Sequence, residues 1–340
     1  MRRVTSPRAL AMALVVVLGT APASTSASTP ASAPVPTVFL GDGVVGGYGI
    51  APVDEGARLS CVRAQENLPD VVEDQLADQS ILLDITADVS CAGAELRHVW
   101  EEQQLGGDVP PAPPQKRALT KDTRLVVAGL GAGTLGLGRI LKQCSAKLRG
   151  TAGALLPEKP VDERSAAGDC AAYFAKGAGA DWLAGRFEQV DKDLEKLFSE
   201  VGSESPSASV VLVGYPRLVP KDVKRCRTAL PEGAGRPLAD VPESAWPFLD
   251  QQVQSRLNSL MAQRAKAAGA VFVDLYATTG GATACDGDAR TTGGLLEPSN
   301  VTLLHQRHPW FLHPNEPGRD QNGDAVAQAI ATGVFGRGPA

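Results

Sequence analysis

The turn Gly41-Asp42-Gly43 directly follows a short apolar run at residues 35–40. A strand that ends in a tight Gly-Asp-X turn presents residue X at the carboxyl edge of a parallel sheet, where α/β proteins place their chemistry. Here X is Gly43, which has no side chain to attack a substrate. Asp42 has two interpretations: its carboxylate is a stand-in nucleophile, or it is a turn residue that binds local amides, which we favour. Gly41 and Gly43 could also simply supply unusual backbone angles.

Three of the four histidines lie close together near the carboxyl end, at His305, His308 and His313. Imidazole serves as a general base or as a metal ligand. The intervals between them do not match a helical zinc pair and no cysteine is adjacent, so we expect no metal here. We expect His305 and His308 to be loop residues near the rim of a pocket. His98 is expected at a solvated helix position.

The six cysteines are widely spaced, without a Cys-x-x-Cys pair. In an exported chain this pattern favours three disulfides over metal ligation. Six cysteines allow 15 pairings, and spacing does not choose among them. Pairing of sequence neighbours would close three moderate loops. The residues are Cys61, Cys91, Cys144, Cys170, Cys226 and Cys285.

The amino terminus has the pattern of a secretory signal peptide. Arg2, Arg3 and Arg8 precede an apolar run at 9–19, and small residues at 21–23 give a cleavage site. We therefore predict a signal peptide at 1–23, a disordered leader at 24–36 and a secreted protein. A membrane anchor is the weaker alternative, because the run falls short of the ~20 residues that span a bilayer. The net charge of −5 shows no basic footprint for nucleic acid.

Short apolar runs alternate with amphipathic stretches, which is the pattern of a parallel sheet flanked by helices. The expected strands are 37–40, 81–85, 125–128, 209–213 and 271–274. The expected helices are 62–76, 96–104, 136–148, 181–201, 243–268 and 320–331. We expect one three-layer α/β/α domain over residues 37–335, with a mainly parallel sheet of about five strands.

Several segments stand in a fixed order along the chain: FLGDGVVGGYGI (39–50), CVRAQENLP (61–69), DVSCAGA (88–94), GAGTLGLGRILKQC (131–144), VVLVGYPRL (210–218) and FLHPNEPG (311–318). Together they resemble the secreted actinobacterial-type lipases and esterases of the SGNH (GDSL) hydrolase family. The resemblance is collinear and spans roughly residues 37–335. It implies that family's three-layer fold, and it supports disulfides between the neighbours 61–91, 144–170 and 226–285.

The resemblance assigns a role to each matching position. The family's nucleophilic serine falls on Gly43, and the glycine whose amide lines the oxyanion hole falls on Gly93. The family's oxyanion asparagine falls on Gly133, or on Ala132 if the match slides by one residue. Neither Gly133 nor Ala132 has a side-chain hydrogen-bond donor. In triad enzymes, removing the nucleophile costs on the order of 10⁶ in turnover, and removing one such donor roughly 10²–10³.

His313 matches the family's catalytic histidine. Three residues earlier, where many members have an aspartate that orients the histidine, this chain has Trp310. We expect the Trp310 backbone carbonyl to hold the same imidazole tautomer. The amides of Gly43 and Gly93, together with His313, would remain as donors to a carboxylate or carbonyl oxygen beside Asp42.

Three interpretations of function stay open. We favour a secreted relative of esterases and lipases whose disabled site binds an acyl, lipid or glycan-ester ligand. The second is an active carboxylic ester hydrolase that uses a water activated by His313 or a substitute hydroxyl from Ser60, Thr86 or Ser90. The third is a cell-wall or protein interaction module. None of the three requires a cofactor, and we expect a monomer.

Overall fold

The computed structural model describes residues 33–337, apart from 57, 106–108, 151–158, 231–234 and 304. The signal peptide predicted at 1–23 and most of the predicted leader lie outside the described residues. The leader was expected to extend to residue 36, but Val35 and Pro36 already belong to the first strand. Within the described part of the chain, no helix is long and apolar enough to cross a membrane.

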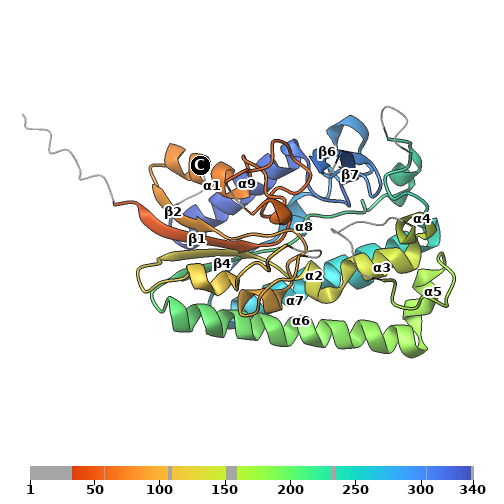
Figure 1. Ribbon diagram of the computed structural model, residues 1–340, viewed down its shortest axis with the longest axis horizontal. Helices are drawn as coiled ribbons and strands as arrows, with labels where there is room; N and C mark the ends of the chain where they lie inside the picture. Colours follow the sequence, from red (N-terminus) through yellow and green to blue (C-terminus); the bar gives the residue numbers. More distant parts are fainter. Residues whose placement is uncertain are drawn as a thin grey trace, which may run out of the picture. The chain divides into compact units, whose positions relative to one another are not determined.

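Five parallel strands form the central sheet in the order β2-β1-β3-β4-β5 (Figure 1). In this sheet β1 pairs with both β2 and β3, so that Phe39 stands opposite Asp88 on one side and Val127 on the other. All five residues of β3 are buried, as expected for a strand covered on both faces. The strands are β1 (Val35–Gly41), β2 (Leu83–Asp88), β3 (Leu125–Gly129), β4 (Ser209–Val213) and β5 (Val271–Val273).

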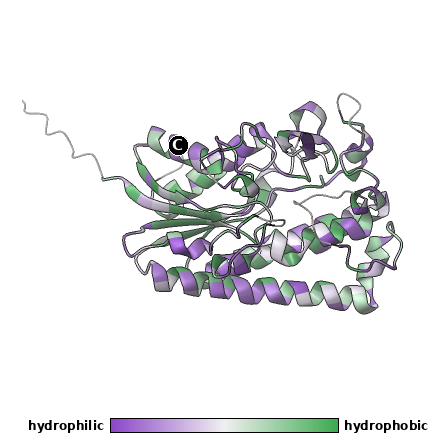
Figure 2. Ribbon diagram, in the orientation of Figure 1, coloured by the Kyte–Doolittle hydropathy of each residue, from purple (hydrophilic) through white to green (hydrophobic). Residues whose placement is uncertain are grey.

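Helices cover both faces of this sheet. Alternate residues of a strand point to opposite faces, so each strand contributes side chains to both helical layers. Phe39 and Val127 pack toward α1 (Leu68–Asp78) and α9 (Glu316–Gly333). Leu40 packs toward the opposite layer, formed by α6 (Gly177–Glu204) and α7 (Arg256–Ala267). Figure 2 shows apolar strands between these layers and a polar outer side on α6. The predicted α/β/α sandwich is confirmed.

The helix predicted at 62–76 begins only at Leu68. Asn67 caps it in a reciprocal arrangement with Asp70, and Pro69 stands in its first turn. These residues are typical of a helix start, so they move the boundary to residue 67. The helix predicted at 96–104 is wrong: the segment holds only a short 3₁₀ helix, η2 (Leu96–Val99).

Two other predicted helices are interrupted. Ser145 divides the segment 136–148, because its hydroxyl accepts a hydrogen bond from the N–H of Leu148 and so starts a new helix. The segment 243–268 contains a 3₁₀ turn, a π-helical stretch and α7.

The further helices are α2 (Ala132–Leu135), α3 (Leu137–Cys144), α4 (Ala146–Arg149), α5 (Cys170–Ala175), α8 (Leu275–Thr278) and the π-helix Phe248–Ser255. Shorter 3₁₀ turns are Leu59–Cys61, Gln115–Ala118, Val223–Arg227, Glu243–Ala245 and Gly287–Ala289.

A small antiparallel hairpin precedes the segment that carries His313. It consists of β6 (Pro298–Leu303) and β7 (Gln306–Pro309). No strand was expected from the sequence at these residues. His308 therefore lies in a strand rather than in a loop, and His305 is an exposed turn residue.

Three disulfides tie the domain together, and each joins neighbouring cysteines as predicted. They are Cys61–Cys91, Cys144–Cys170 and Cys226–Cys285. The first links the segment before α1 to the loop after β2, and this loop contains Gly93. The disulfide Cys61–Cys91 therefore holds the loop that contains Gly93 against the segment before α1.

Candidate active site

The carboxyl ends of β1, β3 and β4 meet at one edge of the sheet because the strands are parallel. The turn at Asp42 and Gly43 follows β1, Ala132 follows β3, and Tyr215 follows β4. His313 comes from outside the sheet, between the hairpin and α9. The fold thus brings residues from distant parts of the sequence to a single edge, as parallel α/β proteins do.

The imidazole of His313 fills the space beside Gly43. A Cβ atom added to Gly43 would lie 2.7 Å from Nε2 of His313 and 3.0 Å from Cβ of Tyr48. These distances are too short for a side chain at position 43 unless the ring withdraws. With the histidine in this place, only glycine fits at position 43.

His313 is held by a single backbone carbonyl. The Nδ1 atom of His313 lies 3.0 Å from the carbonyl oxygen of Trp310, and the His313 N–H donates to the same oxygen at 2.9 Å. Phe311 and Leu312 make this turn with positive φ values of 49° and 62°. Burial lowers the pKa of His313 to about 4, so the ring is neutral near pH 7. Since Nδ1 must carry the proton to donate, Nε2 faces Gly43 as an acceptor.

Asp42 is buried in a hydrogen-bonded chain that joins the three strand ends. Its Oδ1 atom accepts from the N–H of Val44 at 2.9 Å, and its Oδ2 atom accepts from the hydroxyl of Tyr215 at 2.5 Å. The same hydroxyl accepts from the N–H of Ala132 at 2.9 Å. Burial raises the pKa of Asp42 to about 6 and places the pKa of Tyr215 well above its usual value. Tyr215 was not singled out from the sequence, although it stands in the segment VVLVGYPRL.

The two glycines expected to matter for an oxyanion differ in their surroundings. Gly93 is exposed, has a φ of +74°, and leaves ordinary space around a Cβ position. Gly133 is close-packed: a Cβ there would lie 2.6 Å from the carbonyl oxygen of Ala94. Within the described part of the chain, the N–H groups of Gly43 and Gly93 donate no hydrogen bond. Both amides therefore remain available to an acceptor.

A small cavity of about 80 Å³ lies beside Asp42 and His313. Its polar lining includes Asp42, Tyr215 and His313. The apolar part of the lining comes from Val44, Ala132, Leu135, Leu137, Pro216, Leu218, Val253, Leu257, Phe311 and Leu312. Position 132 therefore faces this cavity, whereas position 133 faces Ala94.

The other histidines and the candidate hydroxyls lie elsewhere. His98 was expected to be solvated but is only 5 % exposed, because its Nδ1 atom accepts the N–H of Glu95 at 2.9 Å. Burial lowers the pKa of His98 to about 4. The cavity lining includes neither His305 nor His308, so their expected place at its rim is not observed. Ser60, Thr86 and Ser90 do not line it either. Among the described residues, no group of three His, Cys, Asp or Glu side chains is placed to hold a metal ion.

The sequence matches the GDSL-like Lipase/Acylhydrolase family over residues 39–321. A protein of Streptomyces scabiei named "Esterase" is 49 % identical over 311 residues, which cover 91 % of this chain and 89 % of that relative. The chain belongs to the GDSL-like lipase/acylhydrolase family. "Lipase 2" of Streptomyces coelicolor, which is 28 % identical over 325 residues, is a more distant relative and covers 92 % of this chain and 93 % of its own.

Solved structures share the fold of this GDSL-family protein. The extracellular lipase of Streptomyces rimosus superimposes with a TM-score of 0.57 at 20 % identity, over 86 % of this chain and 97 % of that one. Phospholipase A1 of Streptomyces albidoflavus gives a TM-score of 0.56 at 22 % identity, over 86 % and 98 % of the two chains. At such identities the likeness establishes the fold, a five-stranded parallel sheet with flanking helices.

Proposed function

We propose that this GDSL-family protein is a secreted acyl-binding protein that has lost the ester hydrolysis of its relatives. The name of its Streptomyces scabiei relative supports descent from an esterase. The three disulfides support an oxidising, extracellular location. The apolar cavity beside His313 offers room for a short acyl chain.

The observation that carries the proposal is the contact between His313 and position 43. Ester hydrolysis of this type needs an oxygen nucleophile next to the histidine. At that place the chain has Gly43, and the imidazole itself takes up the space, with Nε2 2.7 Å from where a Cβ would stand. A carboxylate attack by Asp42 receives no support, because both carboxylate oxygens already accept hydrogen bonds.

The polarity of the groups around the cavity defines the ligand more closely. We had expected His313 to be a donor, but its Nδ1 proton is engaged by Trp310, so Nε2 offers only a lone pair. The amide of Gly43, between the lining residues Asp42 and Val44, offers a donor. A short carboxylic acid in its protonated form satisfies both groups, because its carbonyl oxygen accepts from this amide while its hydroxyl donates to Nε2.

Binding of butyric acid tests the proposal. We expect saturable binding by calorimetry at pH 5, with affinity falling up to about tenfold for each further unit of pH, because the complex holds a proton that the free acid has lost. Ala132→Leu fills the cavity and should abolish binding. Ala172→Leu changes an exposed helix residue in the same way and serves as the matched control. No binding at pH 5, or equal binding by the Ala132→Leu variant, would overturn the proposal.

A further inference from the structure

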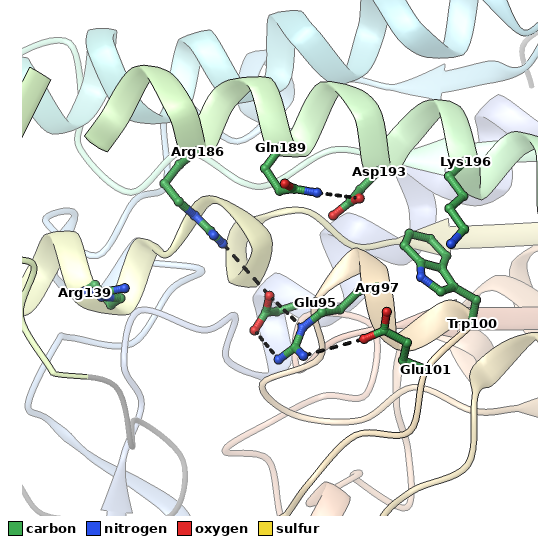
Figure 3. Close-up of a pocket in the computed structure, with 9 residues that line it drawn as sticks. All are labelled: Glu95, Arg97, Trp100, Glu101, Arg139, Arg186, Gln189, Asp193 and Lys196. Atoms are coloured by element: carbon green, nitrogen blue, oxygen red, sulfur yellow. Dashed lines mark hydrogen bonds and ion pairs between the residues drawn. The ribbon is translucent and has the colours of Figure 1, made fainter. Parts of the chain in front are cut away.

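A second hollow, of about 570 Å³, lies on the α6 side of the sheet. The residues after β2 and the helices α3 and α6 line this groove, which is drawn in Figure 3. Its lining shares no residue with the cavity beside His313. The lining of the groove is charged and polar, whereas that of the cavity is mostly apolar.

Two arginines at one end of the groove have unmet hydrogen-bonding capacity. The Nε atoms of Arg139 and Arg186 are both buried without an acceptor. A buried N–H without a partner costs about 1–3 kcal/mol, so such atoms call for an explanation. Within the described residues, Arg139 makes no hydrogen bond and no ion pair. Arg186 donates to the carbonyl of Thr134 and lies 4.0 Å from Glu95.

Packing holds these two arginines in place. The guanidinium of Arg139 lies over the ring of Trp182, 5.2 Å from the ring centroid. The same ring packs on Gly136, and its atoms lie 3.1–3.3 Å from where a Cβ of that glycine would stand. The Nε atom of Arg186 lies 3.8 Å from this same Cβ position. A guanidinium stacked on an aromatic face keeps its edge free to donate, which is the arrangement that suits phosphate.

The cations at the opposite end of the groove already have partners. Arg97 forms ion pairs with Glu95 at 3.2 Å and with Glu101 at 3.7 Å. Lys196 stands over the ring of Trp100, 4.1 Å from its centroid. The arginines of the groove with unpartnered donors are therefore Arg139 and Arg186, which Figure 3 shows on the side away from Trp100.

Between the two ends, α6 presents acceptors to the groove. Gln189 donates through Nε2 to Oδ1 of Asp193 at 2.8 Å, and both side chains point toward the groove (Figure 3). The second carboxylate oxygen of Asp193 and the amide oxygen of Gln189 are acceptors suited to hydroxyl groups. A site with two cationic donors at one end and such acceptors beside them suits a ligand that has an anionic group at one end and hydroxyl groups at the other.

We propose that this groove binds the phosphate ester of a polyhydroxylated alcohol. The phosphate lies against Arg139 and Arg186, whose planar donor forks match its oxygens. The hydroxyl groups of the alcohol reach Asp193 and Gln189. The groove, at about 570 Å³, is far larger than a phosphate ion needs and lies within the usual size of ligand sites. The ligand is either a soluble ester or a phospholipid headgroup, since both present the same chemistry.

Calorimetry with the full chain tests this site, using glycerol 3-phosphate, inorganic phosphate and glycerol at low salt. We expect glycerol 3-phosphate to bind with a Kd below about 1 mM, inorganic phosphate at least threefold more weakly, and glycerol not at all. Arg139→Gln should weaken binding at least tenfold, and it removes no hydrogen bond from the folded protein. Arg186→Gln should do the same, and Arg164→Gln, at a side chain 96 % exposed, should have no effect.

Co-sedimentation with vesicles separates the two sources of the phosphate. Binding to phosphatidylglycerol vesicles that is lost in Arg139→Gln assigns the groove to a lipid headgroup, and binding of the soluble ester alone assigns it to a free metabolite. Absence of saturable binding in both assays would overturn the proposal. So would binding that persists unchanged in Arg139→Gln, and equal affinity for inorganic phosphate would remove the role given to the alcohol.

Discussion

Nε2 of His313 lies 2.7 Å from the position that a Cβ of residue 43 would take. In the function that we propose, this relationship links the lost nucleophile to the position of His313, because the ring can occupy that space only while residue 43 is glycine. It also defines what a restored site requires: the His313 ring must withdraw by a side-chain rotation, and the contact with the Cβ of Tyr48, at 3.0 Å, must lengthen by a few tenths of an ångström.

The first prediction concerns restoration of hydrolysis. Gly43→Ser combined with Ala132→Asn, at the position that faces the cavity, should hydrolyse p-nitrophenyl butyrate at least tenfold faster than either single variant, because nucleophile, base and oxyanion donor act as a unit. Steady-state assays of the three variants, with His313→Ala added to the double variant as a control, measure this. A folded double variant that stays at background would mean that the pocket has closed, and would favour an interaction module.

The second prediction compares the stability of Gly133→Asn with that of Gly43→Ser. Gly133→Asn should lower the free energy of unfolding by about 1–3 kcal/mol, because its Cβ meets the backbone carbonyl of Ala94 at 2.6 Å. Gly43→Ser should cost less, because its nearest contact is Nε2 of the His313 side chain at 2.7 Å, and its other contact, the Cβ of Tyr48, is longer at 3.0 Å. Urea unfolding of both variants checks the order. An equal or reversed order would show that the loop at 131–136 yields more easily than the His313 ring.

The third prediction concerns the carboxyl of Asp42, whose pKa burial raises from 3.8 to about 6. Between these values the folded state holds a proton that the unfolded state has released, so this group's contribution to stability falls as pH rises. The stability of Asp42→Asn relative to the wild type should therefore increase by about 2 kcal/mol from pH 4 to pH 7. A difference that stays constant across this range would contradict the buried, raised-pKa carboxyl.

The fourth prediction concerns the hydroxyl of Tyr215, which joins Asp42 to the amide of Ala132. Tyr215→Phe leaves Oδ2 of the buried Asp42 carboxyl and the half-buried N–H of Ala132 without their partner. It should destabilise the protein by about 2–4 kcal/mol in urea unfolding. Tyr173→Phe, at a half-buried tyrosine on α5, is the matched control and should change stability by less than about 0.5 kcal/mol. Similar losses in both variants would remove the special role given to Tyr215.

The sheet could be predicted from the sequence, because each buried parallel strand is a short apolar run between turns. The strand at 209–213 has the same limits in the structure. Helix boundaries were less predictable. The start of α1 depends on the reciprocal cap of Asn67 and Asp70, which outweighs the amphipathic pattern that begins at residue 62. The β6–β7 hairpin has mixed polar residues and no strong alternation, so nothing in its pattern marked it.

Residues of the candidate site could be predicted only where they stand within a short, distinctive sequence motif. The motif placed Gly43 and His313 together because the family's turn and its histidine segment are both short and distinctive. The link between Tyr215 and Asp42 spans 173 residues and depends on three strand ends meeting, which no local pattern reports. The groove at Arg139 and Arg186 depends in the same way on the packing of α3 against α6.

The most direct test of the central claim is ester turnover by the unmodified protein. Hydrolysis of p-nitrophenyl butyrate should be indistinguishable from that of His313→Ala, and a serine-reactive fluorophosphonate should leave the protein unlabelled, because no serine or threonine among the described residues lines the cavity beside His313. Turnover well above that of His313→Ala, or labelling of any serine or threonine that lines the site, would contradict the account and identify this chain as an active hydrolase with a substitute nucleophile.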